Sequence, residues 1–93
     1  MIEDFACKET AKVFRGEPSR KFPGDIQARA LMKLRQIHRT VSIEQLRVPP
    51  SNRLETLAGN RRGFWSVRIN QQWRIVFRWE EGNATAVQIT DYH

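Results

Sequence analysis

The segment Phe64–Glu80 reads FWSVRINQQWRIVFRWE and decides the fold. Apolar and polar side chains alternate with a period of two over 64–69 and again over 72–80, as in strands with one buried face. Asn70-Gln71 between the two runs is short enough for a hairpin turn, so two adjacent antiparallel strands are predicted. The side chains expected to face the core are Trp65, Val67, Ile69, Trp73, Ile75, Phe77 and Trp79.

Further strands are predicted on both sides of this hairpin. A second turn at 81–83 leads into residues 85–92, where the alternation continues. Arg53–Leu57 is a strand candidate before the hairpin, although its leucines break strict alternation. Met1–Phe5 is short enough for an opening strand. These runs predict an antiparallel sheet.

The part of the chain before Pro49-Pro50 has the period of a helix. Over Asp25–Arg39, apolar side chains fall within about 80° of one another at 100° per residue, which predicts an amphipathic helix. Cys7–Arg15 predicts another helix, and 42–45 has the pattern of a capping box for a short third one that Pro49 ends. Together the elements predict an α+β fold, a twisted antiparallel sheet with two to three helices on one face. The long helix places Ile26, Ala30, Leu34 and Ile37 in its apolar stripe.

The face of the long helix opposite its apolar stripe is basic. It is either a solvated face or a surface for a polyanion or an acidic partner. Its side chains are Arg29, Lys33, Arg35, Gln36 and Arg39.

Length and charge restrict the class of protein further. The chain has 93 residues, a net charge of +6 and a pI near 10.5, which fits a single domain over 1–93 with a polyanionic partner, nucleic acid first and an acidic protein second. The longest apolar run, 75–77, is far too short for a membrane helix, and no secretory signal is expected from the acidic start of the sequence. The single Cys7 cannot form an internal disulfide, which fits a reducing cytoplasm. Cys7, His38 and His93 have no metal-ligand spacing, so no metal and no cofactor are expected.

Strand alternation also predicts what the second face of the sheet presents. If the apolar set packs against the helices, the alternate side chains must point to the other face. Several of these are arginines, whose guanidinium groups stay charged and pair with phosphate oxygens. The face is a candidate phosphate-binding surface; the alternative is a solvated face in which Arg78 pairs with Glu80 or Glu81. The core side continues with Val87 and Ile89, and the other face carries Arg68, Arg74, Arg78, Gln88 and Tyr92.

The chain ends in Asp91-Tyr92-His93 directly after the last predicted strand. RNA can be cut without a metal when a base takes the proton of a ribose 2′-hydroxyl, cations stabilise the phosphate and an acid protonates the departing 5′-oxygen. Arg74, Tyr92 and His93 could supply these parts. The residues contain no pair of histidines or carboxylates arranged for this chemistry, so a nuclease remains one alternative among phosphate-binding proteins.

Several short motifs occur together in residues 52–93. They include G-N-R-x-G at 59–63, W-R-I-x-F at 73–77 and the terminal D-Y-H at 91–93. With this combination the chain resembles the HigB toxins of the RelE/ParE superfamily over essentially its whole length, the N-terminal half in layout more than in residues. The resemblance implies a RelE-like, microbial-RNase-like fold.

The resemblance also implies a function. It is that of a bacterial type II toxin, an mRNA endoribonuclease that cuts on the translating ribosome without a metal and so inhibits translation and growth. It implies a HigA-type helix-turn-helix antitoxin, contact with operator DNA only indirectly through that antitoxin, and no membrane partner. By position, Arg74 resembles the phosphate-stabilising arginine, and Tyr92 and His93 the C-terminal catalytic pair. The residues that would bind RNA are Arg53, Arg61, Arg68 and Arg78.

The chain departs from some relatives at two positions of this pattern. Glu55 stands where they have a histidine, and Ala58 where they have a lysine, which leaves fewer cations for the transition state. Glu55 could instead act as a base. Two alternatives therefore stay open: a non-enzymatic inhibitor of DNA gyrase, as ParE-type relatives are thought to be, and a degenerate toxin that only binds its antitoxin.

Overall fold

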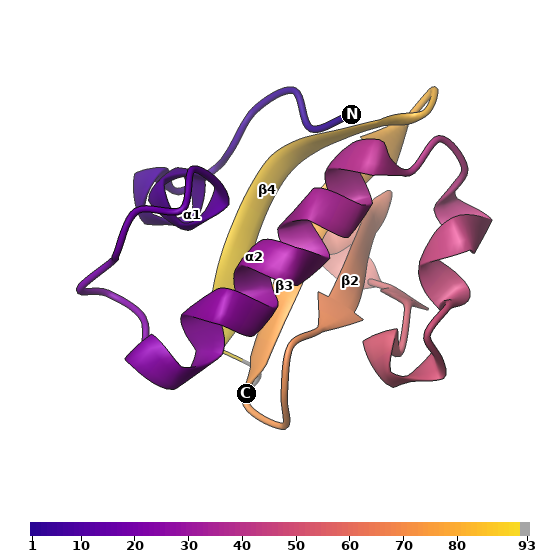
Figure 1. Ribbon diagram of the computed structural model, residues 1–93. Helices are drawn as coiled ribbons and strands as arrows, with labels where there is room; N and C mark the ends of the chain where they lie inside the picture. The colour runs from indigo at the N-terminus through magenta and orange to yellow at the C-terminus, as the bar shows by residue number, and fades with distance from the viewer. Residues whose placement is uncertain (92–93) are drawn as a thin grey trace.

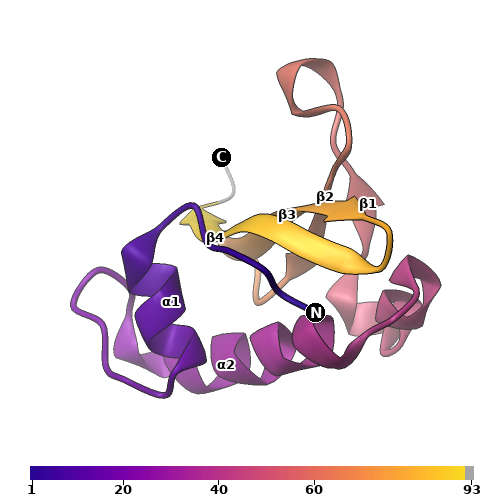
Figure 2. The same cartoon turned by 90° about the horizontal axis from the view of Figure 1, so that it is seen from above.

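The computed structural model describes residues 1–91 and has an α+β architecture. Two helices, α1 (Lys8–Phe14) and α2 (Gly24–Arg39), lie on one face of a sheet, as Figure 1 and, from above, Figure 2 show. The sheet is antiparallel throughout, and its four strands follow in chain order: β1 (Glu55–Thr56), β2 (Phe64–Arg68), β3 (Trp73–Glu80) and β4 (Asn83–Asp91). Short 3-10 helices connect α2 to β2: η1 (Ile43–Arg47), η2 (Pro50–Asn52) and η3 (Gly59–Arg61). The predicted fold class is confirmed.

The core lies between the sheet and α2, as the two periodicities predict. Leu34 and Ile37 of α2 are fully buried, and so are Ile75 and Phe77 of β3. The three tryptophans are partly buried and pack against this core, so they belong to the interior and not to an exposed stacking surface. Within residues 1–91, no helix has both the length and the apolar character that crossing a membrane requires.

The turn between β2 and β3 is held by one side chain. Asn70 Oδ1 accepts hydrogen bonds from the backbone N–H groups of Gln72 and Trp73, both at 2.8 Å. Arg68 and Arg74 pair across the two strands just before this turn. The predicted hairpin is confirmed, and its turn presents two arginines side by side on the sheet.

The segment Met1–Phe5 is not the strand that was predicted. It makes only isolated parallel bridges to β4, Ile2 with Ala84 and Phe5 with Val87. Between these bridges β4 carries a bulge, where Ala86 has φ 51° and its N–H is bonded to Asp4 Oδ1 instead of to a backbone carbonyl. A continuous ladder cannot form across this extra residue.

The predicted strand Arg53–Leu57 is also shorter in the structure. Arg53 has φ 45° and ends η2, because its N–H is bonded to the Pro50 carbonyl. Only Glu55 and Thr56 pair with β2. The left-handed conformation of Arg53, two positions before β1, prevents a strand that begins at Arg53.

The prediction that Lys33 lies on the basic face of the helix, opposite the apolar stripe, is wrong. Its side chain is buried under η1 and η2, where Lys33 Nζ donates to Asn52 Oδ1. Asn52 Nδ2 in turn donates to the carbonyls of Leu46 and Val48 and to Gln36 Oε1, at 3.0 to 3.3 Å. Asn52, which is 1% exposed, therefore fastens the η1–η2 segment to α2.

We expect Asn52→Ala to lower the free energy of unfolding by about 2–4 kcal/mol, because the substitution removes the buried hydrogen bonds of Asn52 to the Leu46 carbonyl and to the ammonium group of Lys33. Urea denaturation measures the loss. Ser51→Ala is the matched control, since Ser51 is exposed and next in the chain, and its effect should stay within about 0.5 kcal/mol. Equal effects of the two substitutions would contradict the role of Asn52.

Lys33 also makes stability depend on pH. Burial, with the nearby charge of Arg29, lowers the pKa of Lys33 below its ordinary value of 10.5. Between the lowered pKa and 10.5 the unfolded chain binds more protons at this site than the folded chain, so the free energy of unfolding should rise with pH there. Lys33→Met should lack this rise. A difference between wild type and variant that stays constant over this pH range would refute the expectation.

Candidate functional site

The face of the sheet turned away from the helices carries the predicted arginines. Arg68, Arg74 and Thr90 form one row across β2, β3 and β4, and Ser66, Val76 and Gln88 form the next. Neither α1 nor α2 covers this open face, since Figure 2 shows both on the opposite side of the sheet. The predicted assignment of Arg68 and Arg74 to one face is therefore confirmed.

Arg74 is buried although it lies on the open face. Its side chain is only 6% exposed, and its Nη2 donates to the Arg53 carbonyl and to Glu55 Oε1, both at 3.1 Å. Both acceptors lie on the far side of β2, so the guanidinium reaches across that strand. Charged hydrogen bonds of this kind are stronger than neutral ones, and they fix the guanidinium in one position.

A cavity of about 350 Å³ opens beside this guanidinium. Three of its lining residues are cations, Arg53, Arg68 and Arg74, and one is an acid, Glu55. Arg68 is held in place because its Nε donates to the Asn70 carbonyl at 3.0 Å. The cavity thus has a positive lining that is partly neutralised by one carboxylate, and it could accept a phosphate group. Asn70 and Gln71 complete the lining.

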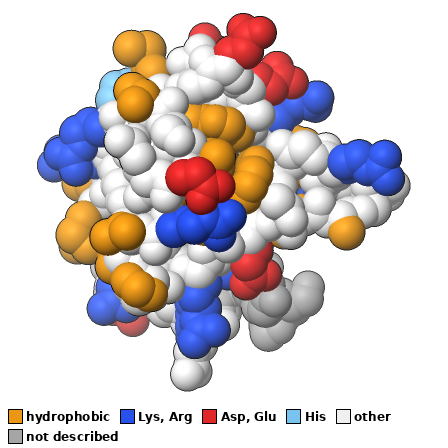
Figure 3. Space-filling view, turned by 90° about the vertical axis from the view of Figure 1, so that its right-hand side faces the viewer, with side chains coloured by type: hydrophobic (Ala, Val, Ile, Leu, Met, Phe, Trp, Pro, Cys, Tyr) orange, Lys and Arg blue, Asp and Glu red, His pale blue; other side chains and the backbone are white. Residues whose placement is uncertain are grey.

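The other predicted RNA-binding arginines are not part of this cavity. Arg78 lies further along β3 and forms an ion pair with Glu80 at 2.9 Å, which is the pairing that the solvated-face alternative predicts. Arg61 ends η3, whose segment projects from the sheet in Figure 2 and forms the lobe with basic side chains at the right of Figure 3. The structure therefore brings together Arg53, Arg68 and Arg74, and leaves Arg61 and Arg78 apart.

The two remaining predicted site residues, Tyr92 and His93, lie outside the described residues. The chain reaches them directly after β4, in which Asp91 pairs with Trp73 and Thr90 pairs with Arg74. Within residues 1–91, no group of histidine, cysteine, aspartate and glutamate side chains could hold a metal ion.

The sequence did not reveal that Glu55 pairs with Arg74. Nineteen residues separate the two in the chain, and β1 has no regular alternation that would set its register against β2. The one feature of the sequence that could have indicated this pair is the negative charge of Glu55 close in the chain to Arg53 and to the predicted arginine face.

Comparisons with known proteins find named toxins among the relatives of this chain. Toxin HigB-1 of Vibrio cholerae is 38% identical over 65 residues, which are 70% of this chain and 68% of the relative. Endoribonuclease HigB of Proteus vulgaris is 29% identical over 93 residues, the full length of both chains.

The solved structures show the same fold. The crystal structure of YafQ from E. coli has a TM-score of 0.61 to this chain, at 15% identity, and covers 98% of this chain and 91% of its own. At this identity the likeness concerns the fold alone. Residues 3–93 match the HigB-like toxins, described as RelE-like toxins of the type II toxin–antitoxin system HigB, and the chain belongs to this family.

Proposed function

We propose that this protein is a toxin that cleaves mRNA on the ribosome, by attack of a ribose 2′-hydroxyl and without a metal ion. The main support is the convergence of Arg53, Arg68 and Arg74 on one cavity of the open sheet face. The relative named Endoribonuclease HigB, which aligns over the full length of the chain, supports the same activity. One domain over residues 1–93 would carry all of this function.

Each part of the reaction has a candidate residue. Arg74, fixed by its bonds to Arg53 and Glu55, would stabilise the charge that develops on the non-bridging phosphate oxygens. Tyr92 and His93 would act as the base and acid. The O2′–P bond forms as the O2′ proton is taken, and the P–O5′ bond breaks as the 5′-oxygen receives a proton. The products are a 2′,3′-cyclic phosphate and a 5′-hydroxyl end.

The partners follow from the proposed role. As in other type II systems, an antitoxin would neutralise the protein, and we propose a HigA-type helix-turn-helix protein through which operator DNA is reached only indirectly. The substrate would be mRNA in the ribosome, and the role requires a cytoplasmic location. Arg61 on the projecting lobe, and Arg78, would contact RNA outside the cavity.

We expect His93→Ala and Arg74→Ala each to relieve growth inhibition, because the loss of one acid–base or phosphate-stabilising group lowers the cleavage rate by roughly 10² to 10⁴. Growth after induced expression, with equal amounts of soluble protein, measures the effect. Arg15→Ala is the matched control: Arg15 is an exposed arginine on the helix side, paired with Glu17, and its loss should leave toxicity intact. Full toxicity of both site variants would refute the catalytic assignment.

The ends of cellular RNA test the reaction itself. Expression should produce new mRNA 5′ ends that carry a hydroxyl and follow the codon phase, and purified protein should cut mRNA in a translating extract but not free mRNA. Ends that carry a 5′-phosphate would contradict 2′-hydroxyl attack. DNA damage without new RNA ends would favour inhibition of DNA gyrase, and neither effect would favour a protein that only binds its antitoxin.

Glu55 should restrain the activity. Its carboxylate lies in the same cavity as the proposed phosphate site and repels an anion there. Glu55→Gln keeps an oxygen that can accept from Arg74 but removes the charge, so we expect tighter binding of a short RNA and faster cleavage, each by about 3- to 10-fold. Fluorescence anisotropy and initial cleavage rates measure the two effects. A large loss of cleavage in Glu55→Gln would instead identify Glu55 as the general base.

A further inference from the structure

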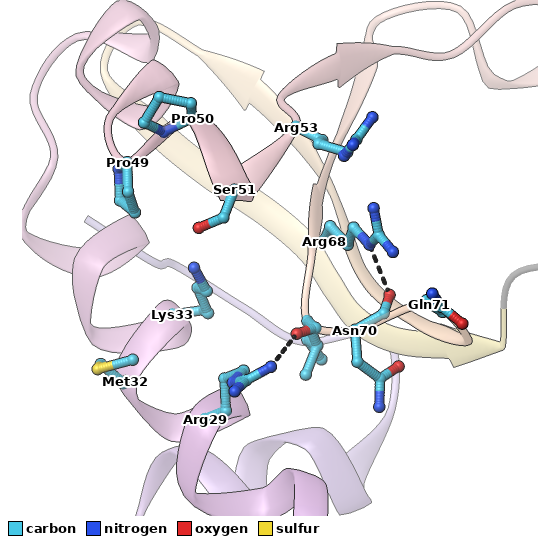
Figure 4. A pocket seen from close by; sticks show the side chains of 11 residues that line it. Arg29, Met32, Lys33, Pro49, Pro50, Ser51, Arg53, Arg68, Asn70 and Gln71 are labelled. Atoms are coloured by element: carbon cyan, nitrogen blue, oxygen red, sulfur yellow. Dashed lines mark hydrogen bonds between the residues drawn. The ribbon is translucent and has the colours of Figure 1, made fainter.

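A second, larger groove lies next to the open-face cavity. It has a volume of about 770 Å³ and runs between α2, η2 and the β2–β3 turn. Figure 4 shows Arg29 and Lys33 on α2 at one side of the groove, and Arg53 and Arg68 at the other. This volume lies within the range of about 300–1,000 Å³ that is usual for ligand sites.

The groove is lined by cations and by no acid. Arg29, Lys33, Arg53 and Arg68 all contribute to its wall, and none of the eleven lining residues is an aspartate or a glutamate. The open-face cavity, by contrast, includes Glu55. An anion therefore meets less repulsion in the groove than in the cavity.

The two cations that α2 contributes to the groove are held by hydrogen bonds. Arg29 Nη1 donates to the Ile69 carbonyl at 3.3 Å, and Lys33 Nζ donates to Asn52 Oδ1. Lys33 is 93% buried, and its pKa is lowered first by this burial and then by the nearby charge of Arg29. A bound anion would counteract this lowering.

The groove also has an apolar part. Met32 is 59% exposed, and the rings of Pro49 and Pro50 are exposed beside it. A nucleotide offers a phosphate for the cations together with the flat faces of a base for apolar contact. An inorganic anion alone would leave this apolar surface uncovered.

The groove and the cavity share part of their lining. Both are lined by Arg53, Arg68, Asn70 and Gln71. An RNA strand could therefore pass from the cavity into the groove, and Glu55 is the one carboxylate in the two linings. We propose that the groove between α2 and η2 binds the single-stranded RNA substrate beyond the nucleotides at the cleavage site. This inference rests on the proposed ribonuclease function and extends it from the cut bond to the path of the strand.

The test compares two single-stranded RNAs with 2′-deoxy substitutions that prevent cleavage: a short one that fills the cavity and one longer by several nucleotides. We expect the wild type to bind the longer strand more tightly, with a steeper dependence on salt. Arg29→Gln should remove about 3- to 10-fold of this gain and reduce the salt slope by about 0.7, the value for one phosphate contact to a single strand. Arg35→Gln is the matched control, because Arg35 is an exposed α2 arginine outside the groove.

The outcomes separate this inference from the proposed function. No gain from the longer strand, or an equal effect of Arg29→Gln and Arg35→Gln, would overturn the groove assignment, even if mRNA is cleaved. A length-dependent gain that Arg29→Gln removes, without any cleavage by the wild type, would support the groove and overturn the ribonuclease. Weaker binding of Arg29→Gln to empty ribosomes, with unchanged length dependence, would assign the groove to ribosomal RNA and also overturn the inference.

Discussion

The rest of the structure depends on the alternation of side chains in β3, because this strand supplies both the core and the open face. Ile75 and Phe77 fill the core against α2, and Arg74, the neighbour of Ile75, must then point away from the helices. On that side Arg74 meets a carbonyl and a carboxylate that compensate its burial. The position of the cation is thus a consequence of how the core packs, and any change that moved the strand would move the guanidinium with it.

The cations of the protein lie in two electrostatically different surroundings. At the open face, Arg74 has a carboxylate as its direct partner, which compensates the burial of the guanidinium charge but weakens its attraction for a phosphate. In the groove, the cations on α2 have neutral acceptors: Arg29 donates to the Ile69 carbonyl, and Lys33 donates to the side chain of Asn52. Neutral acceptors orient a cation without cancelling its charge. We therefore expect the groove to supply most of the affinity for an anion, and the open face to hold the guanidinium of Arg74 in one position.

Much of this arrangement can be predicted from sequence, and the parts that cannot have physical reasons. A period of two assigns side chains to faces without knowledge of any partner, which is why Arg68 and Arg74 are placed correctly. The contact of Glu55 with Arg74 depends on the register of β1, which follows a left-handed residue and no regular pattern. The burial of Lys33 could have been predicted from its position around the helix axis. At 100° per residue it lies about 20° from Ile26, inside the apolar stripe. The roles of Tyr92 and His93 were predicted from family resemblance, because residue types alone do not show which side chains lie close enough together to act as acid and base.

The bulge in β4 has a consequence for the end of the chain. Ala84 and Val87 are both in the core although they are three residues apart, because Ala86 is an extra residue in the ladder. The bulge is a phase shift: before it, even-numbered positions of β4 face the helices, and after it, odd-numbered ones do. If Ala86 were paired as an ordinary strand residue, the strand would be inverted as far as Asp91, with Ile89 exposed and Thr90 turned inwards. The faces of the sheet to which Ile89, Thr90 and Asp91 belong are therefore set by one extra residue near the middle of β4.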